Sequence, residues 1–383
     1  MILPRILLIT NIPNPYRIPL FNELNQQLLA EGYALKVVFG ALGYSRRKWN
    51  INLEDCEFDY TVLPSKFFKK KGQENVIFTY PQLNKLLKDE QAVAIITNAF
   101  SLATTKLWLR NLIIPTPYII WSGAIANNYD RLPLHRILQR KLLVKAATDF
   151  IAYGNKAKEN LVFHGAHEDK VHIAINTVDT VFFAQEAESW RNIVEHNDKH
   201  KLIYVGELSQ RKRVDLLLPA IKILSENRSD FVLYIIGDGS DRKSMESQAK
   251  QLNIEPFIRF EGLKQKKDIP RYFASSSCFL FPTAHDIWGL VLVEAMAAGV
   301  PSIASLHAGA TSDLIQDGKT GFAMDFSDSH KIATRIQWIL EHPKQAKAIG
   351  LAAKQFIEEK VNLRVSAQGI VKAVLSCCHD NNK

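Results

Sequence analysis

Cysteine, long apolar runs and metal-binding patterns are scarce in this 383-residue sequence. The 4 cysteines, Cys56, Cys278, Cys377 and Cys378, form no CxxC pair and no cluster with histidine, so neither a disulfide framework nor a zinc site is indicated. No stretch approaches the roughly 20 apolar residues that a membrane-spanning helix needs, and the opening apolar run is too short for a signal peptide. We therefore expect a cytoplasmic protein.

Three common ligand-binding signatures are also missing. The dinucleotide fingerprint GxGxxG is incomplete, because Arg242 stands where the third glycine should follow Gly237 and Gly239. No phosphate-binding loop of the GxxxxGK[ST] kind occurs, which argues against ordinary ATP or GTP chemistry. No Asp-x-Asp occurs either, so we expect no cofactor and no obligatory catalytic metal.

The net charge of +9 indicates an anionic partner and is unevenly distributed. Residues 1–180 hold 22 Lys and Arg against 15 Asp and Glu, whereas residues 181–383 hold 26 against 24. The sequence has no zinc-finger spacing, no aromatic RNA-binding signature and no continuous basic helix face. We therefore expect no nucleic acid, and favour an acidic membrane surface or a phosphorylated acceptor.

Short β-rich apolar runs alternate with helical patterns along the chain. The runs are 5–10, 34–39, 93–97, 117–121, 149–153 and 170–175 in the first half, and 201–206, 231–237, 257–262, 277–282 and 300–305 in the second. This alternation predicts parallel sheets with crossover helices. We predict an α/β protein of two Rossmann-like domains, 1–180 and 181–383, that face a central cleft. The closing helices exceed what one sheet needs, so the last is expected to cross back onto the first domain.

Two carboxylates in the second half frame the start of an apolar helix. Asp286 and Glu294 are eight positions apart, slightly over two helical turns, so they can share one face. Gly289 would let a diphosphate approach the N–H groups at Leu290 and beyond, and Glu294 would accept hydrogen bonds from a ribose diol. The alternative to a ligand site is that Asp286 only stabilises the N-terminus of a helix, and that the segment after it is an ordinary buried helix.

Two adjacent cations, Arg211 and Lys212, follow the first strand of the same domain. A leaving nucleoside diphosphate needs such cations, because negative charge develops on it as the bond to the sugar breaks. A basic run at a helix start is mildly opposed by the helix dipole, which favours a bound anion. The alternative is a solvated basic turn.

Residues 150–322 resemble the retaining glycosyltransferases of family four, the group 1 glycosyltransferases, with their two-Rossmann B-type fold (GT-B). The resemblance is carried by several ordered motifs: AINTVDTVF (174–182), VGELSQRK (205–212), IIGDGSDR (235–242), FEGL (260–263), the acid pair, and the segment from Gly309 to Phe322. It implies a hexosyltransferase whose catalytic residues are Lys212, Arg211 and Asp286, and the absence of Asp-x-Asp predicts that it is metal-independent. The implied donor-binding residues are Gly206, Lys212, Leu263, Asp286, Gly289, Leu290 and Glu294.

The sequence departs from the family pattern at several places. Glu207 stands where an arginine is frequent, and Asp286 replaces the usual glutamate. The first loop lacks the family's glycine pair, and the strand at 117–121 is not followed by histidine. Its PNPYR and WSG sequences resemble a subset found in bacterial surface-polysaccharide synthesis. The acceptor-side candidates are accordingly Asn14, Tyr16, Arg17, Ser122 and Gly123.

The expected reaction moves a sugar from a UDP- or GDP-sugar, as co-substrate, to a glycan or lipid-linked acceptor. Three segments favour peripheral attachment to the inner face of the plasma membrane. They are two basic and aromatic loops, Arg46–Trp49 and Lys66–Lys71, and a helix at 132–147 that carries Arg136, Arg140, Lys141 and Lys145. Solvated loops over a normal core are the alternative for these segments. For the whole chain, the alternatives are a sugar-nucleotide epimerase of the same fold and a non-catalytic sugar-nucleotide-binding protein.

Overall fold

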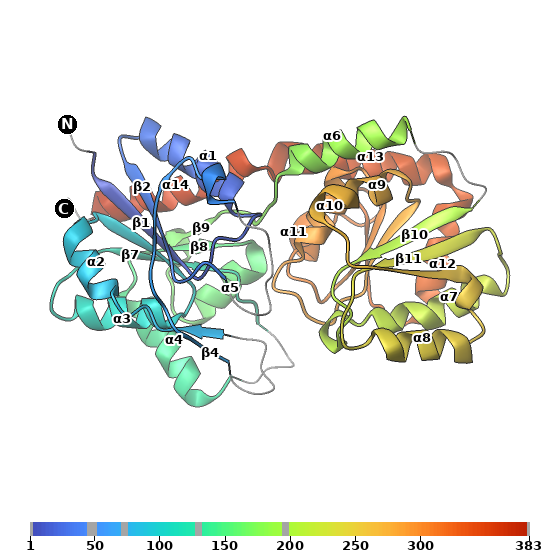
Figure 1. The fold of residues 1–383 in the computed structure, drawn as a ribbon, viewed down its shortest axis with the longest axis horizontal. Coiled ribbons are helices and arrows are strands. Elements are labelled where there is room, and N and C mark those ends of the chain that lie inside the picture. The colour runs from blue at the N-terminus through green and yellow to red at the C-terminus, as the bar shows by residue number, and fades with distance from the viewer. Residues whose placement is uncertain (1–2, 44–51, 70–75, 127–131, 194–198, 381–383) are drawn as a thin grey trace. The chain divides into compact units, whose positions relative to one another are not determined.

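The computed structural model describes residues 3–43, 52–69, 76–126, 132–193 and 199–380, and it divides into two compact units. The first unit comprises Met1–Val178 together with Leu363–Lys383, and the second comprises Asp179–Asn362. Each unit is a parallel sheet with helices on its faces (Figure 1). The expected fold class, an α/β protein of two Rossmann-like domains, is confirmed.

The first unit contains a seven-stranded parallel sheet in the order β3-β2-β1-β6-β7-β8-β9. Its strands are β1 (Arg5–Thr10), β2 (Ala34–Phe39), β3 (Asp59–Val62), β6 (Ala94–Asn98), β7 (Tyr118–Ser122), β8 (Asp149–Ala152) and β9 (Val171–Ile173). A separate antiparallel pair joins β4 (Phe67–Lys69) and β5 (Val76–Phe78). The helices are α1 (Ile18–Ala30), α2 (Leu83–Glu90), α3 (Leu102–Asn111), α4 (Leu134–Ala146), α5 (Asn155–Phe163) and α14 (Leu363–Asp380).

The second unit contains a six-stranded parallel sheet in the order β12-β11-β10-β13-β14-β15. Its strands are β10 (His200–Val205), β11 (Phe231–Ile236), β12 (Ile258–Gly262), β13 (Cys278–Phe281), β14 (Ser302–Ser305) and β15 (Phe322–Met324). The helices are α6 (Thr180–Arg191), α7 (Leu217–Ser225), α8 (Arg242–Gln251), α9 (Ile269–Ala274), α10 (Leu290–Ala297), α11 (Thr311–Leu314), α12 (Ser329–Glu341) and α13 (Pro343–Lys360).

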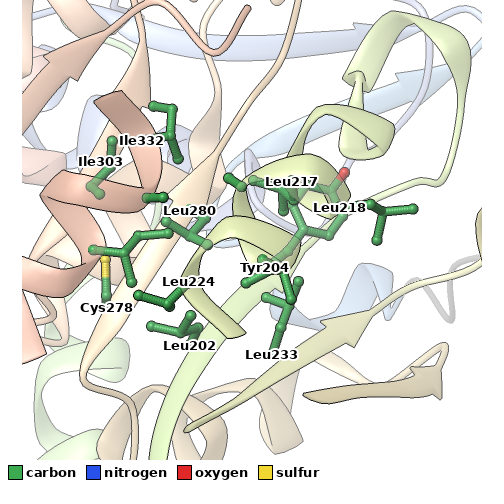
Figure 2. Close-up of a cluster of buried hydrophobic side chains, with 14 of the residues drawn as sticks. Leu202, Tyr204, Leu217, Leu218, Leu224, Leu233, Cys278, Leu280, Ile303 and Ile332 are labelled. Atoms are coloured by element: carbon green, nitrogen blue, oxygen red, sulfur yellow. The ribbon is translucent and has the colours of Figure 1, made fainter. Parts of the chain in front are cut away.

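Buried apolar side chains on alternating strand positions form the core of the second unit. Leu202 and Tyr204 lie two residues apart on β10 and therefore point to the same face of the sheet. They belong to a cluster with residues of β11, β13, β14, α7 and α12, which Figure 2 shows in close-up. This packing fixes β10 and β13 as central neighbours, so the loops that follow them are held at the same edge of the sheet.

The last helix, α14, completes the core of the first unit. In α1, Phe21, Leu24 and Leu28 recur at helical spacing and form one buried face. Ile370 and Val374 of α14 belong to the same buried cluster, and the two helices lie side by side in Figure 1. The expected return of the last helix to the first domain is confirmed, and the end of the expected 181–383 range lies in the first unit. No described helix has the length and apolarity needed to span a bilayer.

Candidate active site

The loop after β10 turns at a glycine that no other residue could replace without strain. Gly206 has φ +155°, and a Cβ there would lie 2.6 Å from the Tyr204 hydroxyl oxygen. That hydroxyl donates a hydrogen bond of 3.0 Å to the Glu207 carbonyl, which fixes the turn. A Cβ on Gly237, which follows β11, would lie 1.8 Å from the Gly206 carbonyl oxygen. Gly237, the first glycine of the incomplete dinucleotide fingerprint, thus allows the loops after β10 and β11 to pack closely.

The three residues predicted to be catalytic meet in the second unit. Lys212 forms an ion pair with Asp286, and both side chains are mostly buried. The Arg211 Nη1 atom lies 3.7 Å from the other carboxylate oxygen of Asp286 and donates a hydrogen bond of 3.1 Å to the His285 carbonyl. Residues that are far apart in the sequence therefore form one cluster of two cations and one carboxylate.

Backbone contacts hold the two loops of this cluster together. The Ala284 N–H donates a hydrogen bond of 3.0 Å to the Arg211 carbonyl, and the Thr283 hydroxyl donates to the same oxygen at 3.2 Å. The Gly309 N–H donates to the Asp286 carbonyl at 2.8 Å and anchors the loop from its other side. The cations are thus presented by a fixed backbone, which lowers the cost of ordering them around a ligand.

Helix α10 begins beside this cluster at Gly289. This residue has φ +108°, and a Cβ would lie 2.6 Å from two ring carbons of Phe281. Its carbonyl accepts the Leu292 N–H at 2.9 Å, so the first turn of α10 starts directly after the glycine. The first turn contains no acidic side chain, and Leu290 is only partly buried. The positive end of the helix dipole is therefore available to an anion.

Glu294 lies one turn further along α10, among buried neighbours that include Val293 and Ala295. Burial raises the pKa of its carboxyl to about 7, and the charge of Lys266 opposes this shift. Within the described part of the chain, the Glu294 carboxylate has no ion pair and no hydrogen bond. A carboxylate in this state can accept hydrogen bonds from a ligand diol.

The remaining donor-side candidates are less tightly placed. The Leu263 side chain is 78% exposed after β12, so only its backbone is suited to a polar contact. Among the described residues, neither Glu294 nor Leu263 has a hydrogen bond or ion pair with the Lys212, Arg211 and Asp286 cluster. The structure thus brings the charged residues of the site together. In the part of the chain that the structure describes, the residues expected to contact the ribose and the base have no hydrogen bond or ion pair with that cluster.

The acceptor-side candidates lie at the carboxyl end of the first sheet. Arg17 stacks over Trp121 at 4.5 Å and over Tyr153 at 5.0 Å. Tyr16 lies against the same guanidinium at 5.6 Å, and the Asn14 carbonyl accepts the Arg17 N–H at 2.8 Å. Tyr153 was not among the residues expected at this site, although it ends the apolar run at 149–153.

Ser122 and Gly123 have a structural position in the turn after β7. Both are buried, and the Ser122 hydroxyl accepts the Ala124 N–H at 3.1 Å. This bond uses the hydroxyl to shape the turn. Of the basic loops, Arg46–Trp49 and the lysines at 70 and 71 lie outside the described residues.

A cavity of about 330 Å³ opens in the first unit and was not foreseen from the sequence. Its lining includes Asn11, Phe78, Tyr80, Phe100 and Arg136. The Tyr80 hydroxyl donates a hydrogen bond of 2.6 Å to the Asn11 side-chain oxygen, so part of the wall is fixed. Aromatic walls with a few polar groups are typical of small-molecule sites.

Sequence comparison relates the second unit to a known family. Residues 185–356 match the family described as "Glycosyl transferases group 1". The chain is 28% identical over 162 residues to the 2-deoxystreptamine N-acetyl-D-glucosaminyltransferase of Niallia circulans, a match that covers 42% of this chain and 41% of that protein. It is 24% identical over 314 residues to the D-inositol 3-phosphate glycosyltransferase of Kribbella flavida, covering 78% of this chain and 70% of that protein.

Structural comparison covers both units. The structure of Anabaena HepE in complex with UDP is similar with a TM-score of 0.77 at 17% identity, covering 97% of this chain and 100% of HepE. At this identity the likeness concerns the fold. Residues 185–356 of this chain are therefore similar in sequence to the group 1 glycosyl transferases, and the chain as a whole has the fold of HepE.

Proposed function

We propose that the chain is a retaining glycosyltransferase that takes a UDP- or GDP-sugar in the Asp179–Asn362 unit and an acceptor in the Met1–Val178 unit. The observation that carries the proposal is the convergence of Lys212 and Arg211 on Asp286, within the segment that matches the group 1 glycosyl transferases. HepE, which shares the fold, has been solved with UDP and with UDP-glucose. The acceptor proposed here is a lipid-linked or surface-polysaccharide precursor.

In the proposed reaction, Lys212 and Arg211 stabilise charge on the departing diphosphate. The ion pairs with Asp286 hold both cations in place before the donor arrives. When the diphosphate binds, it competes for the cations, and the carboxylate then accepts hydrogen bonds from sugar hydroxyls. The departing phosphate accepts the proton of the attacking acceptor hydroxyl, so the anomeric configuration is kept without a protein nucleophile.

The first experiment is a nucleotide-release screen across UDP- and GDP-sugars in the absence of acceptor. Slow release from one donor is expected, because water can replace the acceptor in a site that stabilises the leaving diphosphate. Binding of a donor without release or transfer would instead favour a non-catalytic sugar-nucleotide-binding protein. That second function has one observation in its favour: Glu207 lies 3.9 Å from Arg211 and competes for its charge.

We predict that chelation of divalent metals leaves transfer largely intact. The proposed site masks the diphosphate charge with Lys212, Arg211 and the first turn of α10, so the chemistry does not call for Mg²⁺. The measurement is the transfer rate in excess chelator against the rate in added Mg²⁺. Complete loss of activity that Mg²⁺ restores would contradict the prediction.

We further propose that the first unit attaches to an anionic membrane surface through α4. Leu134 and Leu138 are 84% and 60% exposed, and Leu142 continues the same face at the next helical repeat. Further exposed apolar residues lie at the end of α3, a helix that contacts α4: Leu109, Leu112, Ile113 and Ile114. Basic residues lie on the same helix, so the surface combines apolar and cationic side chains.

The prediction is that the double variant Leu134→Ser/Leu138→Ser binds anionic vesicles at least tenfold more weakly than the parent. Each leucine contributes about 1.5–3 kcal/mol when fully buried, so even partial insertion of two of them exceeds this threshold. Flotation with phosphatidylglycerol vesicles at low salt measures the bound fraction. Leu29→Ser, on the exposed side of α1, is the matched control and should float like the parent. A parent protein that stays entirely in the soluble fraction would contradict the proposal.

A further inference from the structure

The Arg17 side chain is buried and has none of the partners that a buried cation usually has. It is 7% exposed, and its Nη1 atom is buried without a hydrogen bond. Within the described ranges, the guanidinium forms no ion pair and no hydrogen bond. Burial of an unpaired charge opposes folding. The fold therefore keeps Arg17 in a costly state that a ligand could relieve.

Aromatic rings hold the guanidinium in place without satisfying it. The carbon at its centre lies 4.5 Å from the Trp121 ring, 5.0 Å from Tyr153 and 5.6 Å from Tyr16. A ring face attracts the positive charge and restricts the planar group, but it takes up little of the hydrogen-bonding capacity of the five N–H donors. Arg17 is thus oriented in advance, with its donor capacity unused.

The position of this aromatic cage corresponds to the usual ligand edge of a parallel sheet. Trp121 belongs to β7 and Tyr153 directly follows β8, and these strands are neighbours in the sheet. Ligands of open α/β sheets bind at the carboxyl ends of the strands, where both residues lie. The cage is therefore at the place where a ligand of the first unit is expected.

Two further buried polar atoms at this edge also have no partner among the described residues. They are Nε1 of Trp121, a hydrogen-bond donor, and Oδ1 of Asn176, an acceptor that follows β9. Trp121 is itself part of the cage, and the backbone links Asn176 to it, because the Asn176 N–H donates a hydrogen bond to the Tyr153 carbonyl at 3.1 Å. Buried polar atoms are paired in most native structures, so three unpaired ones on neighbouring segments indicate a polar ligand.

We propose that Arg17 binds an anionic group with paired oxygens, a phosphate or a carboxylate, on the acceptor. The proposal rests on the proposed function, in which the first unit takes the acceptor. A guanidinium matches two oxygens of such an anion with two parallel N–H groups, which an ammonium cannot do. Trp121 adds a donor, and the Asn176 oxygen accepts a hydroxyl of the same acidic sugar or sugar phosphate.

The test compares anion binding by the parent and by Arg17→Met, using calorimetric titration with pyrophosphate and, separately, with glucuronate. We expect at least one of the two probes to have an affinity for the parent that is tenfold or more above its affinity for Arg17→Met. If that probe is pyrophosphate, the natural anion is a phosphate, and if it is glucuronate, the natural anion is a carboxylate. Arg17→Lys should recover only part of the affinity. Equal affinities of parent and Arg17→Met for both probes would overturn the proposal.

Arg140→Met is the matched control, because Arg140 is another arginine of the first unit that stacks on a ring, at 4.7 Å from Phe100. It removes the same charge and should bind both anions like the parent. Any anion bound by the Lys212 cluster contributes equally to all these proteins and cancels in the comparison.

Two further readouts separate this role from a structural one and from the proposed function. Removal of an unpaired buried charge should leave the melting temperature of Arg17→Met equal to or above that of the parent. A variant that melts several degrees lower and binds both anions like the parent would show a structural arginine and overturn the proposal. Donor hydrolysis without acceptor is measured on the parent. If the parent itself hydrolyses no donor, the proposed function fails, while the anion titrations still decide the role of Arg17.

Discussion

Lys212→Ala should lower the turnover of sugar transfer by about 10²–10³-fold, the loss seen when one oxyanion-stabilising donor is removed from an active site. The ammonium of Lys212 is mostly buried in its ion pair with Asp286, where water screens its charge only weakly. It faces charge that grows as the bond between sugar and phosphate breaks, so its main effect is on the rate. Steady-state kinetics with saturating donor measure it.

Lys222→Ala is the matched control for this prediction. Lys222 lies on α7 of the same unit and forms a surface pair with Glu226 at 3.6 Å. Its removal should leave turnover unchanged. If Lys212→Ala transfers sugar at the parental rate and melts normally, the diphosphate assignment fails and Arg211 becomes the leading candidate.

Glu294→Gln should weaken donor binding by roughly 1.5–3 kcal/mol, which is the range for hydrogen bonds to a charged group. The ribose that Glu294 is proposed to hold does not change during the reaction, so turnover with saturating donor should change much less. Titration of the nucleotide sugar against both proteins measures the effect. Unchanged donor affinity would place the ribose contact elsewhere.

The pH dependence of donor binding gives an independent check on Glu294. Its pKa of about 7 means that the free protein carries a protonated carboxyl at lower pH. If the ionised form accepts the ribose hydrogen bonds, donor affinity in the parent should rise with pH through about 7 and then level off. Affinity in Glu294→Gln should lack this step.

The raised pKa of Glu294 also makes the stability of the folded protein fall as the pH rises, whereas donor affinity is expected to increase. The folded pKa of about 7 lies above the ordinary value of 4.5, so the folded state binds more protons between these two pH values. The contribution of Glu294 to stability is therefore fully present below pH 4.5 and is lost as the pH rises through 7. Without donor, Glu294→Gln should melt above the parent at pH 8, and the difference should shrink toward pH 5. A parallel offset at both pH values would contradict this account.

The central strands of both sheets could be predicted because their apolar runs are continuous. The run at 5–10 became β1 and the run at 231–237 became β11, since strands buried on both faces need apolar residues at every position. The edge strand β3 is largely exposed and the edge strand β15 is very short, so neither produced such a run. Their existence depends on pairing with β2 and β14, which the sequence does not display.

The residues of the candidate site were proposed from the sequence, but their contacts with one another could not be predicted from it. The meeting of Lys212 with Asp286 follows from β10 and β13 being neighbours, a strand order that local sequence patterns do not encode. The burial of Arg17 was equally out of reach, because arginine is mostly exposed in folded proteins. Only the packing of Trp121 and Tyr153 around it reveals that position.

The return of α14 to the first unit orders the steps by which the chain matures during synthesis. The whole of Asp179–Asn362 is translated before α14, so the second sheet can form while the face of α1 that α14 covers is still open. The first unit is begun first but completes its fold last, because it needs α14, which is translated after the second unit. During that interval the open face is the part of the nascent chain that a chaperone would recognise.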